Sequence, residues 1–145
     1  MFDELVHHRL IMHFKQNDVT FEKIRDNIQQ VEKGTDFSPE IIIVDGCDFE
    51  NVTSNTLSSW KQLAVDQNAA IWFAATLHRE NLQIDERGIP APVNQFTDFF
   101  SVIIMLEPMQ DYINMKLLKD HDSADLKELH VKLDPKTLLI SNHRI

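Results

Sequence analysis

An uninterrupted apolar run, Ile41-Ile42-Ile43-Val44, ends in Asp45 and constrains the fold more than any other segment of the chain. Four consecutive β-branched residues without polar alternation are typical of a strand that is buried on both faces. Such strands occur mainly in parallel sheets that are covered by helices. The run therefore predicts an α/β fold with a parallel core strand at residues 41–44.

The segments that follow this run fit a strand–helix–strand unit. Apolar residues at helical spacing predict a helix over residues 56–67. It follows a polar loop whose candidate N-caps are Asn51, Thr53, Ser54 and Asn55. Residues 69–75 read Ala-Ala-Ile-Trp-Phe-Ala-Ala, which predicts a second fully apolar strand. A strand, a helix and a strand at this length predict a parallel βαβ unit with a right-handed crossover.

Two further helices are expected before the run, and more strands after it. Apolar spacing of three and four residues predicts a helix over residues 3–14, and Thr20 is a candidate N-cap for a helix that Gly34 ends. A β-rich C-terminal extension, antiparallel at its end, is predicted from apolar segments at residues 100–106, 112–119, 129–133 and 137–140. Because no linker or repeat interrupts the 145 residues, we expect a single domain, residues 1–145.

Charge and composition exclude several classes of function. The chain has 14 basic and 23 acidic side chains, a net charge of −9, which argues against a generic nucleic-acid binder because nonspecific affinity for phosphates comes from positive charge. No apolar run approaches the roughly 20 residues that span a bilayer, and the N-terminus lacks the pattern of a signal peptide. The single cysteine, Cys47, has no intrachain disulfide partner, so we expect a cytoplasmic protein.

Polar residues follow the predicted strands at the ends where open α/β sheets bind ligands. Asp45 either holds the Mg²⁺ of a nucleotide or merely ends its strand and caps the loop. Thr76 and His78, which follow the second strand, either sense a phosphate or belong to a solvated loop. Lys119, at the end of a later strand, either reaches a neighbouring phosphate or faces water.

Other catalytic arrangements find less support. His121 is a candidate general base and Cys47 a candidate nucleophile, but no oxyanion loop or base spacing accompanies them, and the scattered histidines lack metal-ligand spacing. The chain has three glycines, and neither a Gly-x-x-x-x-Gly-Lys-Ser/Thr loop nor a Gly-x-Gly-x-x-Gly turn. A phosphate cradle needs successive backbone N–H groups close to the anion, an approach that glycine permits. We therefore expect no ATP hydrolysis by this chain alone.

Taken in order, the segments resemble the second half of the RecA-like ATPase core, especially its DnaB- and KaiC-type branches. Asp3-Glu4-Leu5-Val6-His7-His8-Arg9-Leu10 is similar to the family's helix after the second strand, and Ser38-Pro39-Glu40-Ile41-Ile42-Ile43-Val44-Asp45-Gly46 to its Walker B strand. Residues 57–67 and 70–79 resemble the next helix and the sensor strand, residues 98–106 the "Ala-Asp-x-Val-Ile-x-Leu" strand, and residues 112–119 and 129–140 the closing hairpins. The resemblance covers most of the chain through short motifs in a consistent order.

The resemblance implies an incomplete RecA-like sheet with ATP and Mg²⁺ as cofactors. Asp45 would be the acid associated with Mg²⁺, Thr76 and His78 would lie near a polar sensor, and Lys119 would reach the nucleotide of a neighbouring subunit. His121 stands where the family often has arginine. This departure weakens any role for the residue in activating the nucleotide site of a neighbouring subunit.

The first part of the family's core has no counterpart in this sequence. The phosphate-loop strand, the loop and the strand with the catalytic glutamate would precede Met1, and Glu4 falls too late to replace that glutamate. One explanation is a degenerate, non-hydrolytic domain that acts by oligomerisation or partner binding. The other is a C-terminal fragment of a Mg²⁺- and ATP-dependent ATPase whose Walker A loop lies upstream. We favour the first, because the chain starts with methionine and cannot cradle phosphate.

Both explanations predict an exposed sheet edge. In the family the phosphate-loop strand lies beside the strand at residues 69–75, so its loss leaves an open, apolar edge. We expect this edge to be covered by self-association into a homo-oligomer, by rearranged pairing with the C-terminal strands, or by a partner chain.

Overall fold

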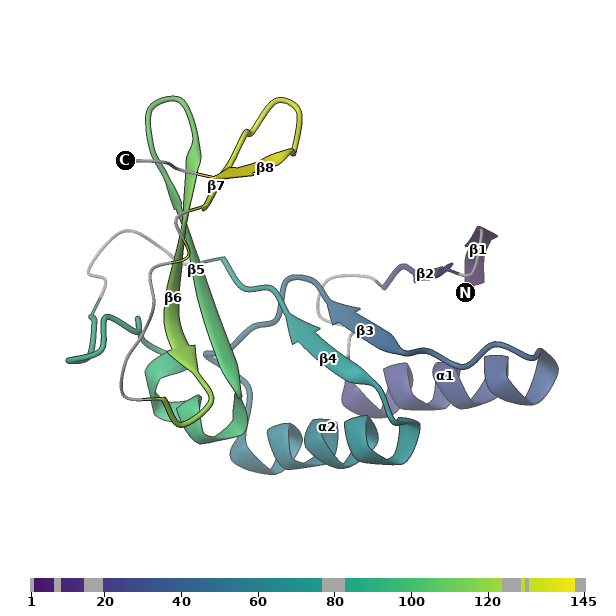
Figure 1. Cartoon of the computed structure of the whole chain (residues 1–145). Helices are drawn as coiled ribbons and strands as arrows, with labels where there is room; N and C mark the ends of the chain where they lie inside the picture. The colour runs from purple at the N-terminus through teal and green to yellow at the C-terminus, as the bar shows by residue number, and fades with distance from the viewer. Residues whose placement is uncertain are drawn as a thin grey trace. The chain divides into compact units, whose positions relative to one another are not determined.

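The computed structural model describes residues 2–6, 9–14, 20–76, 83–123, 129 and 131–142. The described chain is a mixed α/β protein with a small parallel sheet and a four-stranded antiparallel sheet (Figure 1). It divides into two compact units, unit 1 (Met1–Thr76) and unit 2 (Leu77–Ile145). The expectation of a single domain over residues 1–145 stays a prediction.

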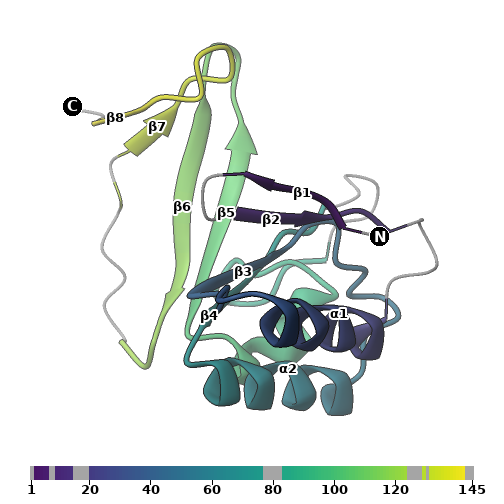
Figure 2. The ribbon, with the colours of Figure 1, turned by 90° about the vertical axis from the view of Figure 1, so that its right-hand side faces the viewer.

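Unit 1 is built on the parallel strand–helix–strand element that the sequence predicts. Strands β3 (Ile41–Val44) and β4 (Ala70–Phe73) pair in parallel, and helix α2 (Ser54–Gln67) connects them. Helix α1 (Phe21–Gly34) precedes β3. Figures 1 and 2 both place α1 and α2 on the same side of the two strands, so one face of the sheet is covered by helices.

Both helices begin at threonines that the sequence identifies as candidate caps. The Thr20 Oγ1 accepts a hydrogen bond from the backbone N–H of Lys23 at 3.3 Å, and the Thr53 Oγ1 accepts one from Thr56 at 3.2 Å. Each such cap satisfies a backbone donor at the helix start and stabilises the helix by about 1 kcal/mol. Helix α1 ends at Gly34, as predicted.

The core of unit 1 lies between the helices and the helix-facing side of the sheet. Trp60 is its centre: its ring centroid lies 4.9 Å from that of Phe21 and 5.5 Å from that of Phe73, both in edge-to-face geometry. Such aromatic pairs contribute roughly 0.5–1.5 kcal/mol beyond the burial of their area. The buried members of this core are Ile24, Ile28, Ile42, Trp60 and Leu63.

The prediction that β3 is buried on both faces is wrong. Ile42 is 8% exposed, but Ile41 is 60% exposed and Ile43 71% exposed, so burial alternates along the strand. On β4, Trp72 is likewise 52% exposed. The physical reason is the number of layers: the helices cover one side of the strands, and no described element of unit 1 buries the other.

The helix predicted over residues 3–14 is also wrong. The structure has an antiparallel hairpin there, formed by β1 (Phe2–Val6) and β2 (Arg9–Met12). Apolar pairs separated by three and four residues fit a helix face and two short strands equally well, so their spacing alone does not decide between the two. The packing of Met12 and Phe14 against the core of unit 1 accompanies the extended conformation. The segment likened to the family's helix therefore has a different structure.

Unit 2 confirms the predicted antiparallel C-terminal extension. Its four strands pair in chain order, so that each is the neighbour of the next. A 3-10 helix, η1 (Val93–Phe99), precedes them. The strands are β5 (Val102–Pro108), β6 (Ile113–Asp120), β7 (Val131–Leu133) and β8 (Ile140–Asn142).

Unit 2 also has a buried interior. Its buried hydrophobic side chains include Ile89, Phe96 and Leu118. Ile89 is held by a turn in which the Asp85 Oδ1 accepts its backbone N–H at 2.8 Å. The expected rearranged pairing of the C-terminal strands with residues 70–73 is not seen among the described residues, where β4 pairs with β3 alone.

Candidate functional site

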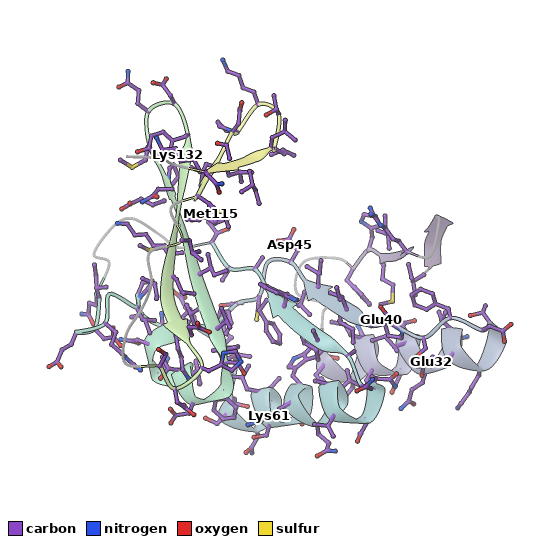
Figure 3. All side chains as sticks on the ribbon, viewed as in Figure 1. Glu32, Glu40, Asp45, Lys61, Met115 and Lys132 are labelled. Atoms are coloured by element: carbon purple, nitrogen blue, oxygen red, sulfur yellow. The ribbon has the colours of Figure 1, made fainter. Side chains whose placement is uncertain are left out.

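The loop after β3 places Asp45 at the carboxyl end of the parallel sheet. Two backbone hydrogen bonds of 2.9 Å, from the Ala74 N–H to the Val44 carbonyl and from the Cys47 N–H to the Ala74 carbonyl, tie the ends of the two strands together. Gly46 has φ +72°, the left-handed conformation that glycine adopts without strain and that turns the chain away from the strand. Asp45 is exposed, and Figure 3 shows it just beyond the end of β3.

Thr76 reaches the same edge from the neighbouring strand. It follows the end of β4 by three residues and is exposed. The parallel pairing therefore brings Asp45 and Thr76 to one edge of the sheet, as the sequence predicts for residues at the carboxyl ends of such strands. His78, the other candidate of this segment, lies outside the described residues.

Lys119 belongs to unit 2, where its ammonium group binds backbone carbonyls. The Lys119 Nζ donates to the carbonyl oxygens of Thr97 and Phe100, both at 2.8 Å. These carbonyls lie at the C-terminal end of η1, where backbone acceptors lack helical partners and a cation interacts favourably with the helix dipole. In this structure Lys119 therefore caps η1, a role that strand periodicity does not reveal.

His121 also has a local partner. Its Nδ1 lies 2.9 Å from the Asp120 Oδ1, and both side chains are largely exposed. Its backbone N–H donates to the Ser101 carbonyl, and its φ of +51° fits a turn at the end of β6. These contacts describe a strand-terminating turn, and they include no nucleophile beside the imidazole.

The edge of the sheet near Asp45 is acidic. Asp45, Asp48 and Glu50 follow β3 within six residues, and residues 34–60 and 68–76 contain no lysine, arginine or histidine. The pKa of Asp48 is lowered, first by a hydrogen bond from the Asn51 side chain and also by the Glu50 backbone N–H. The Asp48 carboxylate therefore carries negative charge at neutral pH.

The described part of this edge can be compared with the usual composition of a phosphate site. Phosphate sites combine successive backbone N–H groups with lysine or arginine, and Mg²⁺ is usually shared between carboxylates and the phosphates. The described residues contain no group of three or more His, Cys, Asp or Glu side chains able to hold a metal ion. In residues 40–60 and 68–76 the sequence supplies carboxylates but no lysine, arginine or histidine, whereas His78 and Arg79 follow outside the described residues.

Cys47 is a poor nucleophile in this setting. Partial burial, together with the negative charge of Asp48, raises the pKa of its thiol to about 11. The thiolate is the reactive form of cysteine, so the thiol at neutral pH is almost entirely unreactive. This supports the interpretation of Cys47 as a packed residue.

Unit 1 also has a groove between α1 and α2. It has a volume of about 250 Å³ and is open to solvent. Its charged side chains, Arg25 and Asp66, already have partners. The Arg25 guanidinium lies 2.7 Å from Asp26, and the Asp66 carboxylate accepts a hydrogen bond from the Gln62 amide at 2.7 Å. The groove therefore offers no unsatisfied charge with which to bind a ligand.

The feature that sequence reasoning missed is the second face of the parallel sheet. Alternation places six exposed residues on it, and we call them the bare face: Ile41, Ile43 and Asp45 from β3 and its end, and Ala70, Trp72 and Ala74 from β4 and its end. Five of the six are apolar, and the sixth is a carboxylate. The sequence carries the apolar run but no sign that one side of it stays uncovered.

The comparisons with known proteins place the chain in no family. A scan against protein-family models returned no match, and neither the curated proteins nor the solved structures contain a match to this chain. Within the described residues, no helix is long and apolar enough to cross a membrane.

Proposed function

We propose that this chain is a non-hydrolytic RecA-like α/β domain that acts by binding another protein chain through the sheet of unit 1. The observation that carries this proposal is the bare face, with Ile41, Ile43 and Trp72 all more than half exposed. Parallel sheets in proteins are normally covered on both faces. Contiguous exposed apolar surface of this kind marks sites of protein interaction.

The RecA-like part of the proposal is supported by the order of the sequence motifs and by the parallel βαβ unit with Asp45 after its first strand. The non-hydrolytic part is supported by the acidic edge and by the absence of a glycine-rich phosphate loop from the sequence. In this interpretation Asp45 remains at the position of a nucleotide-site acid without acting as one.

A second candidate is the C-terminal part of a Mg²⁺- and ATP-dependent ATPase whose phosphate loop lies upstream. The shared edge position of Asp45 and Thr76 favours it. Asp45 would then help to hold Mg²⁺, and Thr76 would contact the bound nucleotide as a polar sensor. The phosphate-binding N–H groups and the lysine would have to come from the upstream segment. A reading frame that contains Gly-x-x-x-x-Gly-Lys-Ser/Thr upstream of this sequence would support this candidate.

A thermal melt with and without millimolar Mg²⁺ and ATP separates the two candidates for the chain as it stands. A bound ligand at a hundredfold excess over its Kd would stabilise the fold by about 2.7 kcal/mol, which raises Tm by several degrees in a chain of this size. We expect no change in Tm and no release of phosphate. A rise in Tm that Asp45→Asn abolishes would contradict the non-hydrolytic proposal and favour the second candidate.

A further inference from the structure

We infer that the bare face binds a cationic amphipathic helix from a partner protein, with its apolar stripe over Ile41, Ile43 and Trp72 and its basic residues beside Asp45. This inference rests on the proposed function, because it names the kind of partner that the sheet of unit 1 takes. Size, shape and charge of the face each contribute to it.

The exposed area of the bare face fits a single helix better than a second copy of this chain. Large apolar side chains present on the order of 150–250 Å² each, so exposures of 60%, 71% and 52% leave roughly 350–400 Å² for Ile41, Ile43 and Trp72 together. A stable interface between two folded proteins buries about 800 Å² on each partner. The face supplies about half of that, an area that one short helix can cover.

The shape of the face agrees with a helical occupant. Strands β3 and β4 have four paired positions each, a length of about 13 Å. At a pitch of 5.4 Å this equals about two and a half turns of α-helix. Helices already cover the opposite face of the same two strands, and helices are the usual cover for parallel sheets (Figures 1 and 2).

The charge around the face selects a basic partner. Asp45 continues the alternation of Ile41 and Ile43, and Asp48 and Glu50 follow it in an exposed loop. Figure 3 shows Asp45 at the carboxyl end of β3, whereas Lys61 lies on α2, which covers the other side of the sheet. Two copies of this face would bring carboxylate against carboxylate, and each chain carries a net charge of −9. Lysine or arginine beside an apolar stripe complements the face instead.

The test uses the full chain and two synthetic peptides of about 14 residues, both patterned as amphipathic helices. One contains leucine and lysine, and the other contains leucine and glutamate in the same pattern. Binding is followed by tryptophan fluorescence, because Trp72 is 52% exposed and will shift to shorter wavelength when covered, whereas Trp60 is already buried. We expect the leucine–lysine peptide to bind at least about tenfold more tightly than its glutamate analogue.

Three variants locate the binding site. Ile43→Asn should weaken binding of the leucine–lysine peptide by about tenfold or more, because it places an amide in the apolar contact. Val65→Asn is the matched control: Val65 is 70% exposed on α2, so the same change should leave binding unaltered. Asp45→Asn should reduce the preference for lysine over glutamate by about threefold or more. Circular dichroism checks the fold of each variant, and Ile41→Asn replaces Ile43→Asn if the latter does not fold.

Several results would overturn the inference. These are equal weakening by Ile43→Asn and Val65→Asn, equal binding of the two peptides, or no response of the Trp72 fluorescence. A wild-type dimer that Ile43→Asn converts to a monomer would assign the face to a second copy of this chain. Any of these results leaves the melting experiment with ATP unaffected, so the failure of this inference is distinct from the failure of the proposed non-hydrolytic role.

Discussion

Cys47 shows how a local environment controls the chemistry of a single residue. Partial burial and the neighbouring Asp48 raise the pKa of its thiol from 9.0 to about 11. We expect its alkylation by iodoacetamide at pH 7 to be about a hundredfold slower than in the unfolded chain, because the thiolate fraction falls tenfold for each unit of pKa. The rate should rise with pH up to about pH 11, and a plateau near pH 9 would contradict this prediction. The same chain in concentrated denaturant is the control.

Lys119 is a residue whose partners decide its role. Because its Nζ binds the Thr97 and Phe100 carbonyls, we expect Lys119→Met to lower the free energy of unfolding by about 1–2 kcal/mol. Lys116→Met is the control: Lys116 forms an exposed pair with Glu107 at 2.8 Å, and such pairs contribute about 0–1 kcal/mol. Urea denaturation measures both. Equal losses in the two variants would show that the contacts of Lys119 add nothing to stability.

At the scale of elements, the one-sided burial of β3 predicts that the same substitution has different effects on stability at Ile42 and at Ile43. Ile42→Thr places a hydroxyl in the core of unit 1 and removes buried carbon, so we expect it to lower the free energy of unfolding by about 2–4 kcal/mol. Ile43→Thr, on the bare face, should change it by less than about 0.5 kcal/mol. Threonine keeps the β-branched shape that suits a strand, so the two variants differ in burial alone. A large loss for Ile43→Thr in urea denaturation would mean that the face is covered in the free chain.

The candidate site also depends on how elements are paired. Parallel pairing of β3 and β4 brings Asp45 and Thr76 to one edge, a placement that the strand–helix–strand pattern predicts without a structure. The same pattern does not predict the roles of Asp45 and Thr76. The acidic loop after β3 supports the proposal of a cationic partner, because opposite charges attract.

For the molecule as a whole, the two compact units predict two separable unfolding transitions. Unit 1 buries its own core around Trp60, and unit 2 buries Ile89, Phe96 and Leu118. Both tryptophans of the chain, Trp60 and Trp72, belong to unit 1, so their fluorescence reports that unit alone. We expect the urea midpoint from fluorescence to differ from the midpoint from far-ultraviolet circular dichroism, which reports both units. Coincident midpoints would support the single-domain prediction instead.

The sequence by itself determined the elements whose signals are local. Thr20 and Gly34 bound α1, Thr53 is one of four candidate caps that the sequence offers for α2, and the apolar runs form β3 and β4. A cap needs only the backbone three residues away, and helical or strand periodicity is complete within one turn or one strand. The antiparallel C-terminal strands and the negative charge follow from the sequence in the same way.

Only the tertiary structure decided the features that depend on distant partners. Residues 2–6 pair with residues 9–12, although the short apolar pairs of this segment also suit a helix, and Met12 and Phe14 pack against the core of unit 1. The acceptors of Lys119 lie 19 and 22 residues away along the chain. The apolar run at β3 predicts burial, but burial depends on how many layers surround a sheet. With helices on one side, Ile41 and Ile43 remain exposed and form the surface from which we infer the partner.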